Sequence, residues 1–270
     1  MKPYPEPPDG LVVERDGAVL RVRLDRPDRR NAVTDDMVLA MIETVEAAGS
    51  DESVRVLELS GTGEHFCSGF DLGLRGGGDG DKPRAGATQR QMRWHVNRLV
   101  PTMLETQTPI VTRATGWVIG LGLHLVLASD FAVVADDARL REPFATMGFT
   151  PDSGGSWLIP RLAGVARAKE MLMLGREVSG EQAAEWGLVH RSAPAADVPR
   201  VAGELVDELS SAATVAVGLA KVLIQRGLTV DLDRHLADEA FAIELASRSD
   251  DFHEYAQARR EKRDPEFRGR

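Results

Sequence analysis

The chain has 270 residues, of which 43% are hydrophobic and 28% charged, a composition typical of a soluble globular protein of enzyme size. Its formal net charge of −9 at pH 7 argues against nucleic acid and anionic membranes as partners, because both require clustered positive charge. Cys67 is the only cysteine, which excludes an internal disulfide, and no Cys/His cluster has zinc spacing. No segment approaches the roughly 20 apolar residues of a membrane helix. From the single cysteine, the absence of zinc spacing and the absence of a membrane segment, we expect a cytoplasmic protein without a bound metal.

The first part of the chain alternates between strand and helix patterns. Two β-like runs within residues 11–24 flank Asp16-Gly17, a strong hairpin-turn signal. Thr34 then precedes a periodic apolar run and is placed to cap a helix. Residues 54–59 predict a further strand. This alternation indicates an α/β layered fold.

The middle of the chain repeats this alternation after a glycine-rich segment. Residues 73–86, with the sequence GLRGGGDGDKPRAG, predict a long loop of the kind that covers a functional site. We expect the elements that follow to be a helix at 88–105, a strand at 110–114, a helix at 121–128 and a strand at 131–135.

Beyond residue 165 the sequence predicts helices, interrupted by one short strand at 188–191. The expected helices lie at 167–174, 180–186, 197–210, 214–227 and 231–247. We therefore divide the chain into an α/β core over residues 1–195 and a helical C-terminal region over residues 196–270. That region is expected to pack onto the core or onto a neighbouring subunit.

One carboxylate stands at a conspicuous turn. Pro151 fixes the backbone before Asp152, and Gly154-Gly155 permits an unusual path after it, just ahead of an amphipathic helical run. Asp152 is therefore either the N-cap of that helix, a common and purely structural role, or a catalytic group held at a tight turn.

A pair of glycines marks a second position of interest. Gly120-Leu121-Gly122 follows a strand and opens a helix, but Leu125 stands where a dinucleotide-binding motif would have its third glycine. The pattern instead indicates exposed backbone N–H groups, which stabilise negative charge on a ligand or in a transition state. No P-loop motif is present, and Ser68 lacks the surroundings of a hydrolase nucleophile.

Several segments match one family in its own order along the chain. They are Arg26-Pro27 with Asn31-Ala32, Phe66 to Leu72, Pro109 to Gly122, Ser129-Asp130, Pro151 to Leu162, Ala183 to Val189, and Glu261 to Arg263 with Phe267. Over nearly its whole length the chain resembles the crotonase superfamily, which is the enoyl-CoA hydratase/isomerase family.

The resemblance implies a ββα spiral core that binds a CoA thioester. Coenzyme A would enter as part of the substrate, and no cofactor would be tightly bound. The backbone N–H groups of Phe70 and Leu121 match the two donors that hold the thioester oxygen in this family, and their expected role is an oxyanion hole. Leu121 replaces a glycine usual in the family, but a backbone donor does not depend on its side chain.

The departures from the family pattern decide which chemistry is expected. Hydratases of the family carry two glutamates at the positions that His124 and Phe144 occupy here. Asp152 matches instead the aspartate that serves as the base in certain isomerases, including the ring-epoxide isomerase of phenylacetate degradation. We therefore expect an enoyl-CoA isomerase with Asp152 as proton shuttle. The alternatives are a hydratase, a dehalogenase or thioester hydrolase with Asp152 as nucleophile, and a non-catalytic acyl-CoA-binding protein.

The remaining site candidates follow from the same resemblance. His124 lies one helical turn after Leu121 and is either a pocket residue or a satisfied core histidine. The family's assembly implies a homotrimer or a dimer of trimers, with the tail near Lys262 beside a neighbouring subunit's site. Candidate contacts to the CoA portion are Arg29, Arg30, Ala32, Ser68, Phe70, Asp71, Leu72 and Lys262.

Overall fold

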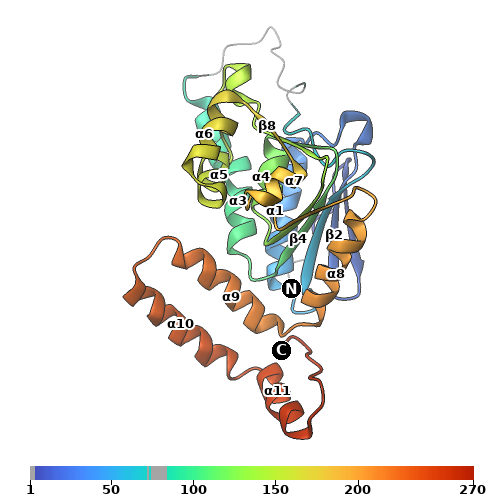
Figure 1. Ribbon diagram of the computed structural model, residues 1–270, viewed down its shortest axis with the longest axis vertical. Coiled ribbons are helices and arrows are strands. Elements are labelled where there is room, and N and C mark those ends of the chain that lie inside the picture. The colour runs from blue at the N-terminus through green and yellow to red at the C-terminus, as the bar shows by residue number, and fades with distance from the viewer. Residues whose placement is uncertain (1–3, 72, 74–83) are drawn as a thin grey trace.

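The computed structural model describes residues 4–71, 73 and 84–270 (Figure 1). The strands are β1 (Leu11–Asp16), β2 (Val19–Leu24), β3 (Val56–Gly61), β4 (Ile110–Ala114), β5 (Trp117–Ile119), β6 (Phe131–Ala135), β7 (Arg139–Arg141), β8 (Glu177–Ser179) and β9 (Arg191–Ala193). The helices are α1 (Asp35–Ser50), α2 (Ala87–Trp94), α3 (Val96–Glu105), α4 (Leu121–Leu127), α5 (Gly155–Ala163), α6 (Val165–Leu174), α7 (Gly180–Glu185), α8 (Val198–Ser211), α9 (Thr214–Gly227), α10 (Leu232–Ala246) and α11 (Asp250–Glu261). The prediction of an α/β fold is confirmed.

The larger sheet has the strand order β1-β2-β3-β4-β6-β9. Its β1 and β2 are antiparallel, as the Asp16-Gly17 turn predicts, and Gly17 has the positive φ of 56° that such a tight turn requires. The remaining pairs are parallel, and each crossover includes a helix. The N-terminus of α1 is capped as predicted, because the Thr34 hydroxyl accepts a hydrogen bond from the Met37 N–H at 3.2 Å.

A smaller sheet, in the order β5-β7-β8, was absent from the sequence prediction. Each of its strands has three residues, too few to show a periodic pattern. Its first strand leads directly into α4, and the backbone N–H of Gly120 bonds to the carbonyl of Arg141 at 3.0 Å. The small sheet therefore fixes the start of α4.

Other boundaries also differ from the prediction. The single helix expected at 88–105 is broken at His95, whose φ and ψ of −119° and −109° are not helical, giving α2 and α3. The last strand of the core falls at 191–193 rather than 188–191, and α11 was not predicted. Leu72 and most of the predicted loop at 73–86 lie outside the described residues.

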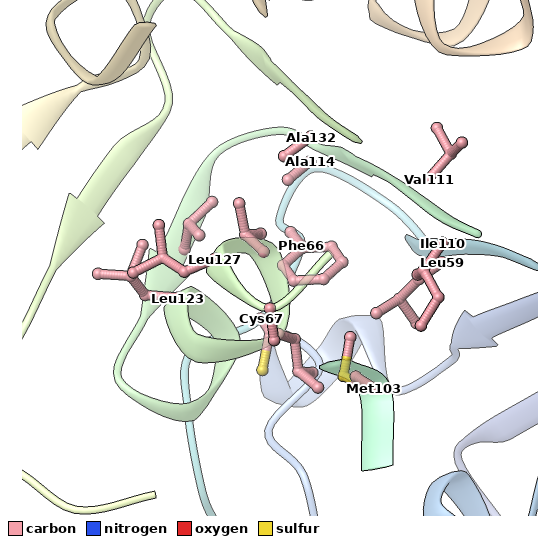
Figure 2. Close-up of a cluster of buried hydrophobic side chains, with 14 of the residues drawn as sticks. Leu59, Phe66, Cys67, Met103, Ile110, Val111, Ala114, Leu123, Leu127 and Ala132 are labelled. Atoms are coloured by element: carbon pink, nitrogen blue, oxygen red, sulfur yellow. The ribbon is translucent and has the colours of Figure 1, made fainter. Parts of the chain in front are cut away.

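The hydrophobic core includes buried side chains of the large sheet and of helices α1, α3 and α4. Phe66 and Cys67 are fully buried among Met103 of α3 and Leu123 of α4 (Figure 2). Helices α1 and α3 pack together, and α8 packs against β3, β4 and β6. Among the described ranges, no helix is long and apolar enough to cross a membrane.

Helices α9, α10 and α11 extend away from the sheet and the helices packed on it (Figure 1). Helices α9 and α10 pack against each other, and α9 also contacts α3. A buried ion pair ties α9 to the core: the Lys221 Nζ lies 2.7 Å from Asp130 Oδ2 and donates to the carbonyl of Thr108 at 3.2 Å. Burial lowers the pKa of Lys221 and raises that of Asp130, although the ion pair opposes both shifts.

Replacing Lys221 with Met should lower the free energy of unfolding by about 3 kcal/mol, because it leaves the Asp130 carboxylate largely buried without its cation. Urea denaturation of the purified protein measures this loss. The exposed Lys169→Met on α6 is the matched control and should change stability by less than about 0.5 kcal/mol. Equal effects of the two substitutions would refute the anchoring role of Lys221.

Candidate active site

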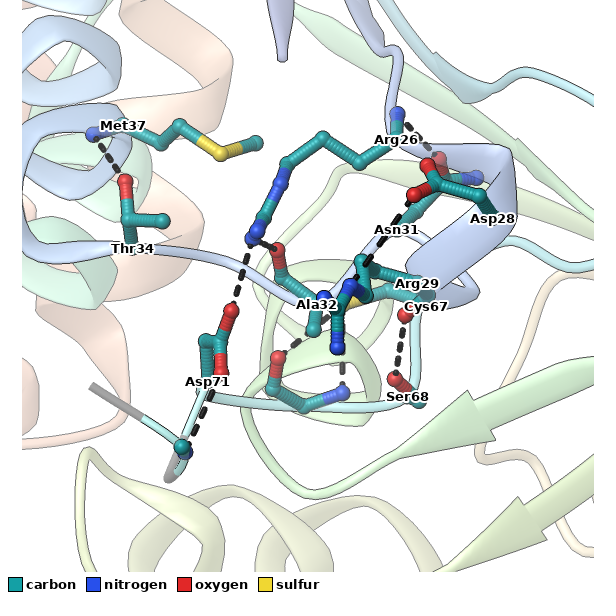
Figure 3. Close-up of polar contacts among 12 residues, drawn as sticks. Arg26, Asp28, Arg29, Asn31, Ala32, Thr34, Met37, Cys67, Ser68 and Asp71 are labelled. Carbon is teal, nitrogen blue, oxygen red and sulfur yellow. Dashed lines mark hydrogen bonds and ion pairs between the residues drawn. The ribbon is translucent and has the colours of Figure 1, made fainter. Parts of the chain in front are cut away.

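A network of polar contacts joins the loop at 26–33 to the segment at 67–71 (Figure 3). One guanidinium nitrogen of Arg26 donates to the Ala32 carbonyl at 2.6 Å and lies 3.0 Å from Asp71 Oδ2. Asn31 is fully buried, and its side-chain amide donates to the carbonyls of Thr62 and His65. The two segments are therefore held as one unit beside the sheet.

Segment 67–70 also lies against the start of α4. Cys67 and Val118 form a parallel bridge, in which the Cys67 N–H donates to Trp117 O at 2.9 Å and the Ile119 N–H donates to Cys67 O at 3.0 Å. Gly122 permits this approach, because a Cβ there would lie 2.6 Å from the Cβ of Cys67. Burial raises the pKa of the Cys67 thiol to about 12, so this residue is a packing group rather than a nucleophile.

The Phe70 and Leu121 positions border one small cavity of about 120 Å³, as the resemblance implies. Leu121 is the first residue of α4, so its N–H has no carbonyl partner within the helix. The remaining walls come from α2, α3, and the turns at 143–147 and 152–153. Residues of two adjacent segments and Asp152 thus line one cavity.

Asp152 lies in a strained turn at the edge of this cavity. The following residues have positive φ angles, 48° at Ser153 and 106° at Gly154, and the first of these is rare for a non-glycine residue. The cap of α5 is Gly154, and no side chain caps this helix. The alternative in which Asp152 serves as a helix cap is therefore wrong. Its half-buried carboxylate has no hydrogen-bond or ionic partner among the described residues.

Asp152 and Ser153 also line a second, larger cavity of about 820 Å³. This groove lies between α3, α5 and α9, with apolar walls that include Val100, Trp157 and Val222. The two cavities share the turn that carries Asp152. Asp152 and Ser153 therefore belong to the walls of both cavities.

His124 does not contact the cavity, contrary to its place among the candidate catalytic residues. Its side chain is fully buried, and its Nε2 lies 2.8 Å from Oε1 of Glu142, which is equally buried. The ring of Phe144, which lines the small cavity, is stacked on the imidazole with the ring centroids 6.3 Å apart. His124 therefore lies one side-chain layer behind the site.

Glu142 was missed by sequence reasoning. Strand β7 ends at Arg141, and its three residues are too few to show the alternation that would mark position 142 as buried. Position 142 is also not one of the two positions at which hydratases of the family carry glutamates. The result is a buried histidine–carboxylate pair at positions 124 and 142, whereas the hydratase pattern has glutamates at positions 124 and 144.

The candidates for CoA contact are only partly brought together. Ser68 and Phe70 line the small cavity, whereas Ala32 and Asp71 belong to the neighbouring Arg26 network. Arg29 is exposed, and the Arg30 guanidinium lies 4.3 Å from the Trp117 ring centroid. Lys262 is the C-cap of α11 and lines neither cavity. Leu72 is outside the described residues.

Comparison with known proteins identifies the family of this chain. Residues 14–270 match the model of the enoyl-CoA hydratase/isomerase family, so the chain belongs to that family. Its substrates are therefore CoA thioesters. The chain is 34% identical to a 1,2-epoxyphenylacetyl-CoA isomerase of Escherichia coli (strain K12), over 93% of this chain and 95% of that protein. It is 30% identical to 4-chlorobenzoyl coenzyme A dehalogenase-1 of Arthrobacter sp, over 83% and 80% respectively.

The fold leads to the same family. The crystal structure of an enoyl-CoA hydratase from Bacillus anthracis superposes with a TM-score of 0.89 at 30% identity, covering 97% of this chain and 100% of that one. The expected crotonase-type fold is therefore confirmed. The names of these relatives include an isomerase, a dehalogenase and a hydratase, so family membership alone leaves the reaction open.

The close approach of α4 to segment 67–70 can be tested at Gly122. Because the added methyl of Gly122→Ala would meet Cys67, we expect a loss of about 1–3 kcal/mol in the free energy of unfolding, together with weaker binding of acetyl-CoA. Chemical denaturation and calorimetric titration measure the two effects. Gly203→Ala in α8 has open space around it and should instead gain up to about 1 kcal/mol. A Gly122→Ala protein as stable as Gly203→Ala would contradict the contact.

Proposed function

We propose that the protein is an enoyl-CoA isomerase in which Asp152 moves a proton between two carbons of the acyl chain. The main support is the Asp152 carboxylate, which lines the cavity and has no ionic partner among the described residues. The two positions at which family hydratases carry glutamates hold the buried His124 and the apolar Phe144, and neither presents a carboxylate to the cavity. One accessible base suits proton transfer better than the activation of water by two acids.

In this mechanism the thioester oxygen is held by the backbone N–H groups of Phe70 and Leu121. Asp152 removes a proton from the acyl chain, and negative charge develops on that oxygen as an enolate forms. Each donor aimed at this charge contributes about 3 kcal/mol to the stabilisation of the transition state. The carboxylic acid then returns the proton to a different carbon, which shifts the double bond and regenerates the base.

The binding of the substrate follows from the same arrangement. Coenzyme A enters as part of the substrate, and no tightly bound cofactor is required. Its pantetheine arm would lie along segment 67–70, beside the Arg26 network, which fixes that segment without a ligand. The acyl group would pass Asp152 and occupy the mostly apolar groove between α3, α5 and α9.

A nucleophilic role for Asp152 is the second candidate. The 30% identity to a dehalogenase favours it, and a carboxylate without a partner could attack an activated carbon. Single-turnover reaction in oxygen-18 water separates the two roles, because only the nucleophilic route transfers solvent oxygen into the Asp152 carboxylate. Hydration of crotonyl-CoA without any double-bond shift would support a hydratase, and binding without turnover would support an acyl-CoA-binding protein.

Asp152→Asn should reduce turnover by about 100-fold or more, because the amide cannot accept the proton. Stability should change little, since α5 is capped by Gly154 and not by this side chain. The assay follows double-bond migration in 3-enoyl-CoA thioesters of several chain lengths and ring opening of an aryl-epoxide CoA thioester. The exposed Asp137→Asn is the control and should retain full turnover. A well-folded Asp152→Asn protein with undiminished turnover would remove Asp152 from the mechanism.

We also propose that the protein assembles as a trimer or a dimer of trimers through its C-terminal helices. In the single chain, large apolar side chains of these helices remain exposed, including Ile224, Leu232, Phe241 and Ile243, each about two-thirds accessible. Sedimentation velocity at micromolar concentration should therefore give a trimer or hexamer. Phe241→Glu should dissociate it, whereas Lys169→Glu on α6 should not. A monomeric wild-type protein would overturn the proposal.

A further inference from the structure

The buried His124–Glu142 pair has polar atoms that no contact within the chain satisfies. Nε2 of the histidine and Oε1 of the glutamate are 2.8 Å apart, and both side chains are completely inaccessible. The other two polar atoms, Nδ1 and Oε2, are buried and have no hydrogen-bond partner among the described residues. Burying such a pair costs desolvation free energy that its single hydrogen bond only partly offsets. Two apolar side chains of similar size would usually stabilise the core as well or better. Its presence therefore calls for a reason other than stability.

The pair joins three segments that carry the candidate active site. His124 is on α4, three residues after Leu121, which lines the cavity. Glu142 immediately precedes Pro143 and Phe144, which form another wall of that cavity. The third segment is the start of α5, which touches both members of the pair.

The contact with α5 is made by the backbone of Gly155. A Cβ at this position would lie 2.4 Å from Nε2 of His124 and 3.2 Å from Oε1 of Glu142. The Gly155 N–H in turn donates to the backbone carbonyl of Asp152 at 3.1 Å, which closes the turn that presents the carboxylate. The hydrogen-bonded pair therefore forms the surface on which this turn rests.

We infer that His124 and Glu142 are positioning residues that fix the distance between the Leu121 N–H and the Asp152 carboxylate. Neither side chain contacts the substrate, because Phe144 lies between the imidazole and the cavity. The hydrogen bond makes α4, the 142–144 segment and the start of α5 one rigid unit, so that the oxygen-binding amide and the base keep their separation during proton transfer. This inference rests on the proposed role of Asp152 as the base.

The test replaces both polar partners with apolar residues of similar size, in the double variant His124→Leu/Glu142→Met. The urea midpoint should stay the same or rise, because no unpaired polar group is left. Turnover of the 3-enoyl-CoA substrate should fall by about 100-fold, as expected when reacting groups shift by about 1 Å. KM should change by less than about threefold, because the contacts to the CoA portion lie on other segments. A purely structural pair predicts unchanged kcat, and that result would overturn the inference.

Two further variants keep the inference testable if the double variant fails to fold. Glu142→Gln can still hydrogen-bond to Nε2 and should keep turnover within about tenfold of the wild-type protein. Gly155→Ala retains both side chains of the pair, but its methyl group would lie 2.4 Å from Nε2 of His124 and must push the pair and α5 apart, so kcat should fall with little change in KM. Unchanged kcat in folded Gly155→Ala, or a folded Glu142→Gln protein whose turnover falls by about 100-fold or more from wild type, would contradict positioning through this hydrogen bond.

A readout independent of turnover is the carbonyl resonance of bound, carbon-13-labelled butyryl-CoA, a saturated thioester that does not isomerise. The wild-type protein should shift this resonance from its position in free butyryl-CoA, and the double variant should reduce the shift. Asp152→Asn separates the two proposals. If that variant is fully active, the proposed function fails. If it is inactive while the double variant turns over normally with an unchanged carbonyl shift, only the positioning role fails.

Discussion

The candidate site depends on the backbone contact between segment 67–70 and the start of α4. The hydrogen bonds of Cys67 to Trp117 and Ile119 fix the direction of this contact, and the absence of a side chain at Gly122 sets its closeness. Because neither segment can move without breaking buried backbone hydrogen bonds, the amides of Phe70 and Leu121 keep one relative position. Preorganisation of this kind is what allows backbone donors to stabilise charge that develops on a ligand.

The sequence predicted the parts of the fold that carry local signals. The Asp16-Gly17 hairpin, the Thr34 cap and the apolar strands of the large sheet were identified because turn chemistry, capping and periodicity act over a few residues. The β5-β7-β8 sheet was missed, since strands of three residues are defined by distant partners and not by their own pattern. The break at His95 likewise has no marker in the sequence, because neither proline nor glycine stands there.

The candidate site divides in the same way. Asp152, Phe70 and Leu121 could be chosen from motifs, and they line one cavity. The partner of His124 could not be chosen, because Glu142 lies 18 residues away and meets it only after β7 has paired with β5. A histidine one turn after a cavity-lining residue has two possible surroundings, and only the tertiary packing of Phe144 over the ring decides between them.

Asp152 differs from three other shielded acids in a way that bears on its proposed function. Glu58 is paired with Arg113, Asp71 with Arg26 and Asp130 with Lys221, as expected where water cannot solvate a charge. Asp152 has no such partner among the described residues, but it stands where two cavities meet, and there water can solvate it. An acyl group bound beside Asp152 would displace water from around the carboxylate. In the proposed mechanism this carboxylate is the base, and the inferred role of the pair behind Gly155 is to support the turn that carries it.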